Sequence, residues 1–174
     1  MNLKEKIRSI PDFPKKGIMF RDITTLLKDA DALRFAVKQM KAHYKGQKID
    51  IVVGPESRGF IFGAILAHEF KAGFVPVRKK GKLPAQVECH EYALEYGTDK
   101  IEVHCDAIRA GDSVLIVDDL LATGGTAGAA AKLVEKLGGK VAECAFVIDL
   151  PDLKGSQKLT ARWPVFSIVE FKGE

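Results

Sequence analysis

Residues 114–126 have the sequence Val114-Leu-Ile-Val-Asp118-Asp119-Leu-Leu-Ala122-Thr-Gly-Gly-Thr126, and this stretch decides the fold. Its four consecutive apolar residues predict a strand that is buried on both faces, as the strands of parallel sheets are. The glycine-rich turn leads directly into residues 127–137, a strongly helical segment that Gly138 and Gly139 end. A buried strand, a turn and a helix in this order indicate an α/β domain.

Strand and helix patterns alternate through the rest of the chain. Further apolar runs predict strands at residues 49–53, 74–77, 141–148 and 165–169. Residues 30–45 carry apolar side chains at steps of three or four, which predicts an amphipathic helix with Asp29 or Asp31 as its N-cap. Residues 58–71 have the length of another helix. We therefore expect a doubly wound α/β fold, with a mainly parallel twisted sheet flanked by helices.

Two segments lack this regular alternation. Apolar residues between Leu3 and Ile10 have helical spacing, which predicts a short N-terminal helix that ends before Pro11. Residues 79–98 are polar, contain glycine and proline, and have no steady period. We expect a long loop there, of a kind that is usually functional or mobile. The 174 residues as a whole are expected to form one domain around a single core.

Composition narrows the possible partners. The 27 Lys and Arg against 23 Asp and Glu give a net charge of +4, which suits anionic ligands but is low for a dedicated nucleic-acid-binding protein. Cys89, Cys105 and Cys144 lack the spacing of a disulfide framework or a zinc site. The N-terminus has no apolar signal segment, and no apolar run approaches the roughly 18 residues that span a bilayer. We expect a cytoplasmic protein that binds neither nucleic acid nor a membrane.

The segment after the strand at residues 114–117 combines groups that bind a phosphorylated sugar. Ligands of open α/β sheets bind beyond the carboxyl ends of the strands, where Asp118 and Asp119 are expected. Backbone N–H groups of the turn, the hydroxyls of Thr123 and Thr126 and the positive helix end together suit a phosphate. Neighbouring side chains of a strand point to opposite sides, so at most one carboxylate is expected to face a given sugar directly. An ordinary strand–turn–helix junction is the alternative, because such glycine turns are common.

The glycine spacing also excludes two common nucleotide loops. The chain has no G-x-x-x-x-G-K-[ST] motif, and residues 124–128 lack the spacing G-x-G-x-x-G. The stretch instead resembles the phosphoribosyl-pyrophosphate motif of type I phosphoribosyltransferases, in which apolar residues precede two acids and a small Thr/Gly-rich loop. The resemblance implies that Asp118 and Asp119 hold the ribose hydroxyls. It implies that the 5′-phosphate is held by Ala122, Thr123, Gly124, Gly125 and Thr126.

The resemblance covers nearly the whole chain and points to the adenine-specific branch of the family. It continues through residues 11–14, 17–23, 54–60 and 77–84. The pyrophosphate loop of the family matches Glu56, Ser57 and Arg58, with a non-proline cis bond expected between the first two. A cation at the start of a helix is unfavourable, and a nearby anion would remove that conflict. Further pyrophosphate contacts are implied for Arg78, Lys79 and Lys82, for which a solvated charge run is the alternative.

Two further parts of the site are implied by the same resemblance. Residues 1–28 would form a hood over the base, which would lie near Met19, Phe20 and Arg21 with Leu120 on its opposite face. Residues 79–98 would form a flexible flap, in which Glu95 is a candidate proton carrier to the purine and Tyr96 approaches the reacting centre. A glutamate in a polar loop is otherwise unremarkable, so the catalytic role of Glu95 stays open at this point. Arg58, Asp118 and Asp119 are the other residues for which a catalytic role is expected.

The activity implied by the resemblance is the conversion of adenine and 5-phosphoribosyl-1-pyrophosphate (PRPP) to AMP and pyrophosphate. Mg²⁺ would be held mainly by the substrate pyrophosphate and water, since no dedicated protein cage is visible. Transferases for 6-oxopurines usually carry Asp at the position of Ala122, so its absence favours adenine over xanthine, guanine or orotate. A homodimer is expected. A regulator of the same fold without catalysis is the second alternative, although no part of the catalytic loop is missing.

Overall fold

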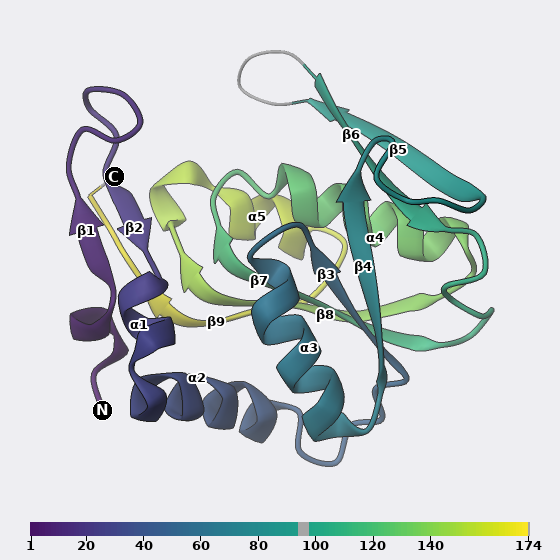
Figure 1. Ribbon diagram of the computed structural model, residues 1–174, viewed down its shortest axis with the longest axis horizontal. Helices are drawn as coiled ribbons and strands as arrows, with labels where there is room; N and C mark the ends of the chain where they lie inside the picture. Colours follow the sequence, from purple (N-terminus) through teal and green to yellow (C-terminus); the bar gives the residue numbers. More distant parts are fainter. Residues whose placement is uncertain (94–97, 174) are drawn as a thin grey trace.

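A seven-stranded sheet runs through the middle of the protein in the order β5-β6-β4-β3-β7-β8-β9 (Figure 1). The computed structural model describes residues 1–93 and 98–173. The strands of this sheet are β3 (Ile51–Pro55), β4 (Gly73–Lys79), β5 (Val87–Ala93), β6 (Thr98–His104), β7 (Ser113–Leu121), β8 (Lys140–Asp149) and β9 (Val165–Glu170). The neighbouring strands β4, β3, β7, β8 and β9 pair in parallel, whereas β6 is antiparallel to both β4 and β5. The predicted mainly parallel sheet is confirmed.

Helices cover both faces of this sheet. They are α1 (Thr24–Lys28), α2 (Ala30–His43), α3 (Gly59–Phe70), α4 (Gly125–Lys136) and α5 (Gly155–Thr160), with short 3₁₀ turns η1 (Leu3–Lys6) and η2 (Pro151–Leu153). In β7, Leu115 and Val117 pack in the core formed with α2 and α3, whereas Val114 and Ile116 pack in the core formed with α4. The apolar run is therefore buried on both faces, as predicted. Within the described residues, we find no helix long and apolar enough to cross a membrane.

The helix α2 begins and packs as its sequence predicts. Of the two candidate N-caps, Asp29 is the one used, because its Oδ1 accepts the backbone N–H groups of Asp31 and Ala32, each at 3.1 Å. Such a cap satisfies donors that the first helical turn leaves without partners. Ala36 and Met40 on the apolar stripe are completely buried. The stripe therefore belongs to the core.

The N-terminal segment differs from the predicted helix. Only one 3₁₀ turn forms, and the chain then extends as β1 (Arg8–Ile10), which pairs antiparallel with β2 (Phe20–Asp22) in a separate two-stranded sheet. Leu3 and Ile7 are buried as expected for the apolar positions. A helix of this length is marginal in isolation, and pairing with β2 satisfies the same backbone groups. The helix prediction was wrong because a distant strand competes for this segment.

The segment predicted to be an irregular loop contains much of a β-hairpin. β5 pairs with β6 along its whole length, with Glu91 opposite Lys100 in an ion pair of 2.6 Å. One side of β6 is apolar and buried through Ile101 and Val103, while the other side is polar and includes the half-buried Lys100 and the buried Glu102. Opposite charges on facing strands stabilise such a pair. Because many residues of β5 and β6 are polar, the alternation of apolar and polar residues that predicts a strand is not apparent in the sequence. Residues 94–97, between the two strands, lie outside the described part of the chain.

Candidate active site

The carboxyl end of β7 and the turn before α4 border a cavity of about 260 Å³. Residues 56–58, between β3 and α3, form another wall, and residues 118–127 supply most of the remainder. These are the two segments for which sugar and pyrophosphate contacts were predicted. The structure thus brings the predicted residues from Glu56 to Arg58 and from Asp118 to Thr126 to one cavity.

The glycine-rich turn is shaped by contacts on both sides. Gly124 has a φ of +76°, which favours glycine, and α4 begins at the next residue with its first N–H groups at the cavity. On one side, α5 packs so closely that a Cβ atom on Gly155 would lie 2.1 Å from the carbonyl oxygen of Ala122. On the other side, the Tyr92 hydroxyl of β5 lies 3.2 Å from the Thr126 Oγ1. The turn is therefore packed closely against α5 and contacted by β5.

Asp118 and Asp119 both line this cavity although both belong to β7, so the expectation from strand alternation that at most one of them faces the ligand is wrong. Asp119 is 2% exposed, and its Oδ2 accepts a hydrogen bond from the Arg58 Nε at 2.5 Å. The Oδ1 of Asp118 accepts the backbone N–H of Asp119 at 2.9 Å. Burial and the neighbouring Asp119 carboxylate raise the pKa of Asp118 well above its ordinary value. The two acids therefore differ in their partners while facing the same space.

Arg58 stands at the N-terminus of α3, the unfavourable end for a cation. The Asp119 carboxylate, 61 residues further along the chain, offsets this unfavourable position by accepting a hydrogen bond from Arg58. Burial would lower the pKa of Arg58, but the carboxylates of Asp119, Asp118 and Asp22 outweigh burial and raise it. The expected cis bond between Glu56 and Ser57 is present. The guanidinium group is thus fixed at the boundary of the cavity in its charged form.

Basic residues at the end of β4 and just beyond it gather around Glu56. The Arg78 Nε donates to its Oε2 at 2.7 Å, the backbone N–H of Lys79 donates to the same oxygen at 2.9 Å, and the Lys82 Nζ donates to Oε1 at 3.0 Å. Burial alone would raise the pKa of Glu56, but these hydrogen bonds outweigh it and hold the pKa at about 2. The Lys79 side chain pairs instead with Asp99 at 3.4 Å. This part of the chain is therefore not a simple solvated charge run.

A second pocket is bordered by the two-stranded sheet of β1 and β2. It is lined by Phe13, Phe20, Arg21 and Asp22, among others, and it shares Arg58 with the main cavity. The rings of Phe13 and Phe20 meet edge to face, with centroids 5.1 Å apart. Apolar and aromatic walls of this kind suit a flat ring. The two pockets are adjacent, because the same arginine borders both.

Among the described residues, four predicted contacts line neither of these two pockets, namely Met19, Arg78, Lys79 and Lys82. Met19 is half-buried before β2 and is not among the residues that line the second pocket. Glu95 and Tyr96 lie outside the described residues. Within residues 1–93 and 98–173, no group of three His, Cys, Asp or Glu side chains is placed to hold a metal ion. The sequence interpretation also missed Tyr92 and Asp22, since a tyrosine in a polar segment and an acid in a short hood give no distinguishing pattern.

Comparisons with known proteins agree with this geometry. The phosphoribosyl transferase domain family matches residues 22–171. The adenine phosphoribosyltransferase of Methylobacillus flagellatus is 61% identical over 173 residues, which cover 99% of this chain and 98% of that protein. The crystal structure of adenine phosphoribosyltransferase from Rhodothermus marinus has a TM-score of 0.92 at 54% identity, covering 97% of this chain and 96% of the other.

A further solved structure was determined with ligands. It is the adenine phosphoribosyltransferase of Saccharomyces cerevisiae in complex with adenine and D-2,5-dideoxy-2,5-imino-altritol 1,6-bisphosphate. Its TM-score is 0.91 at 43% identity, and the match covers 96% of both chains. These matches extend over nearly the full length of each protein. The chain therefore belongs to the phosphoribosyltransferases and, among them, to the adenine phosphoribosyltransferase family.

Proposed function

We propose that this chain joins adenine to the phosphoribosyl group of PRPP, forming AMP and releasing pyrophosphate, a reaction of purine salvage. The observation that carries this proposal is the adjacency of two pockets that share Arg58. One pocket is lined by two acids and a glycine-rich turn, which suit a phosphorylated ribose. The other is lined by the aromatic rings of the hood. A base in the second pocket would lie beside a sugar in the first.

The acids and the turn would hold the sugar. Asp118 and Asp119 would accept hydrogen bonds from the two ribose hydroxyls, and residues 122–126 would hold the 5′-phosphate through backbone N–H groups and two hydroxyls. The turn is contacted from both sides by Tyr92 and Gly155. Contacts of this kind would favour one arrangement of the donors and so reduce the entropy lost when a phosphate binds.

The cations would stabilise the leaving group. Displacement at the anomeric carbon develops positive charge on the ribose and negative charge on the departing pyrophosphate, by analogy with other glycosyl transfers. Arg58, Arg78, Lys79 and Lys82 would bind that pyrophosphate, next to Glu56 and Ser57. Donors that are already aimed at developing charge lower the barrier most. Glu56 holds the side chains of Arg78 and Lys82 close together, because both donate hydrogen bonds to its carboxylate.

Mg²⁺ fits this set of groups. It prefers oxygen ligands from carboxylates, phosphates and water. The adjacent acids Asp118 and Asp119 supply carboxylate oxygens at the wall of the main cavity. We propose that the ion is held mainly by the substrate pyrophosphate and water, where it would neutralise part of the leaving group's charge.

The hood would select the base. Adenine would lie near Met19, Phe20 and Arg21 with Leu120 on its opposite face, and a backbone C=O and N–H of Arg21 would pair with its amino group and N1. Hypoxanthine presents the reverse donor and acceptor pattern at these positions. Ala122 supplies no acid for N7 of a 6-oxopurine.

The flap would complete the site. Glu95 is the proposed proton carrier to the purine, and Tyr96 is the proposed neighbour of the reacting centre. Closing such a segment over the substrates would exclude water that otherwise hydrolyses PRPP.

We further propose that residues 1–174 form one domain, with a hood at residues 1–28 and a flap at residues 79–98. The protein would act as a homodimer, because members of the family commonly associate. Free Cys89, Cys105 and Cys144 suit the reducing cytoplasm.

The test is to incubate the purified protein with Mg²⁺, PRPP and each purine in turn, while nucleotide formation is followed. AMP should form from adenine, and no comparable nucleotide should form from hypoxanthine, guanine or xanthine. Turnover of hypoxanthine in preference to adenine would contradict the proposed base.

A further inference from the structure

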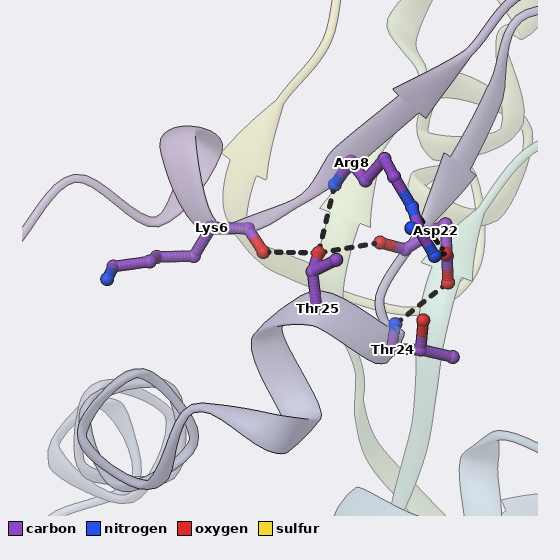
Figure 2. A network of polar contacts seen from close by, with 5 residues as sticks. All are labelled: Lys6, Arg8, Asp22, Thr24 and Thr25. Carbon is purple, nitrogen blue, oxygen red and sulfur yellow. Dashed lines mark hydrogen bonds and ion pairs between the residues drawn. The ribbon is translucent and has the colours of Figure 1, made fainter.

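Asp22, at the end of β2, is only 8% exposed although it lies in a small sheet at the edge of the protein. Figure 2 shows that its Oδ2 accepts hydrogen bonds from both the Nε and the Nη2 of Arg8, the former at 3.0 Å. Its Oδ1 accepts the backbone N–H of Thr24 at 2.9 Å. These donors lower the pKa of Asp22 to about 2, with Arg8 contributing most. The carboxylate is therefore ionised, and both of its oxygens have partners.

Thr25 links the neighbouring strand β1 to the same group of hydrogen bonds. The Thr25 hydroxyl, on α1, donates to the carbonyl oxygen of Lys6 at 2.7 Å and accepts the backbone N–H of Arg8 at 3.1 Å (Figure 2). Three segments of the hood, namely β1, β2 and α1, thus meet in one hydrogen-bonded network. Asp22 is the charged centre of this network.

The strand β2 depends on such a network, because it has no place in the seven-stranded sheet. A two-stranded sheet with three residues in each strand is marginal on its own in water. The register places Arg8 directly opposite Asp22, and Ser9 opposite Arg21. A slip of one residue would turn every side chain of β2 to the other face. The ion pair between opposite residues therefore fixes the register of the strand.

Asp22 also lines the second pocket, which shares Arg58 with the main cavity. Phe20, Arg21 and Arg58 line this hood pocket as well. The side chain of Arg21 donates to the Ser9 Oγ of β1 at 2.5 Å, and its Cζ lies 4.2 Å from the centroid of the Phe171 ring, near the C-terminus. The placement of the Arg21 backbone in the pocket is thus determined by how β2 is anchored.

We propose that Asp22, held by Arg8, is a positioning residue for base recognition: it fixes the register and depth of β2, and with them the backbone groups of Arg21 that distinguish adenine from 6-oxopurines. This inference rests on the proposed function, since it requires the base to bind in the hood pocket. The sugar and phosphate groups are held by β7 and its turn, which belong to the main sheet. Loosening β2 should therefore weaken base recognition more than PRPP binding.

The test compares Asp22→Asn, Arg8→Lys and the control Lys6→Met in the full-length enzyme. Asp22→Asn keeps the shape of the side chain but removes its charge, and Arg8→Lys keeps the charge but removes the two-pronged guanidinium contact. Lys6→Met removes a different ion pair of the hood, that of Lys6 with Asp29 at 2.7 Å. For each variant we would measure KM for adenine, KM for PRPP, the ratio of kcat/KM for adenine to that for hypoxanthine, and the Tm.

For Asp22→Asn we expect KM for adenine to rise about tenfold and the adenine preference to fall by a similar factor, while KM for PRPP changes little. Arg8→Lys should also raise KM for adenine more than KM for PRPP, but to a smaller extent. This variant keeps the test decisive if Asp22→Asn does not fold. Lys6→Met should resemble the wild type. An unchanged adenine KM, or equal increases in both KM values that follow the loss of Tm, would overturn the positioning role. Failure of the wild type to form AMP would instead refute the proposed function.

Discussion

Replacement of Glu56 by Gln should destabilise the protein in a way that depends on pH. Its carboxylate is 10% exposed and accepts hydrogen bonds from Arg78, Lys82 and the backbone of Lys79. The glutamine amide has nearly the same shape, but it loses the charge and places an N–H₂ group against cations. The substitution therefore isolates the electrostatic contribution of the carboxylate from its packing.

The magnitude follows from the pKa. A fall from the ordinary 4.5 to about 2 corresponds to about 3 kcal/mol of stabilisation at neutral pH. The side chains of Arg78 and Lys82 are 32% and 51% exposed, so solvent weakens their attraction and we expect about 2 kcal/mol for Glu56→Gln. Since the pKa is lowered in the folded state, this stabilisation is complete above about pH 4.5 and is lost as the pH falls toward 2.

The assay is urea unfolding of wild type and Glu56→Gln at pH 7 and at pH 3. The difference in the free energy of unfolding should be about 2 kcal/mol at pH 7 and less than half of that at pH 3. Glu91→Gln is the matched control, because Glu91 and Lys100 form an ion pair in which both side chains are more than 40% exposed. It should lower the free energy of unfolding by less than about 0.5 kcal/mol, because exposed ion pairs of this kind contribute little. A Glu56→Gln difference that is the same at both pH values would refute the electrostatic explanation.

Three further sets of variants test the residues around the main cavity. Asp118→Asn combined with Asp119→Asn should lower kcat at least about 100-fold with an unchanged circular dichroism spectrum; an unchanged rate would refute their role. Tyr92→Phe removes one hydrogen bond to the phosphate turn and should raise KM for PRPP severalfold but not KM for adenine, as steady-state kinetics would show. Gly155→Ala should lower both Tm and PRPP affinity because its Cβ meets a turn carbonyl, whereas Gly128→Ala, with only ordinary contacts, should be tolerated.

The sequence predicts the parts of the fold that local patterns encode. The apolar run of β7, the glycine turn and the N-cap Asp29 lie where the residues indicate, because burial on both faces, positive φ and capping each leave a short-range pattern. The two wrong predictions of secondary structure concern segments whose structure depends on a distant partner. Residues 8–10 pair with β2, and residues 87–93 pair with β6. Pairing of this kind overrides local spacing and polarity.

The contacts of the site depend even more on long-range topology. Glu56 meets Arg78 and Lys82 because β3 and β4 are parallel neighbours, with Pro55 opposite Val77 at their carboxyl ends. By itself, the run of basic residues at positions 78–82 predicts a solvated surface. The sequence does not show that Glu56, just after β3, faces this run. The family resemblance named these residues as ligand contacts but gave no indication that they bind one another.

The same topology brings Arg58 against Asp119. β3 and β7 are adjacent and parallel, with Val53 opposite Ile116, so the chain leaves both strands at the same edge of the sheet. The cation assigned to the pyrophosphate is therefore paired with an acid assigned to the ribose. Binding of the donor at both groups would exchange this ion pair for contacts with the ligand. Loss of Asp119 would thus remove a proposed sugar contact and also leave Arg58 without its counter-ion. A variant at this position would therefore change the binding of the ribose and of the pyrophosphate at the same time.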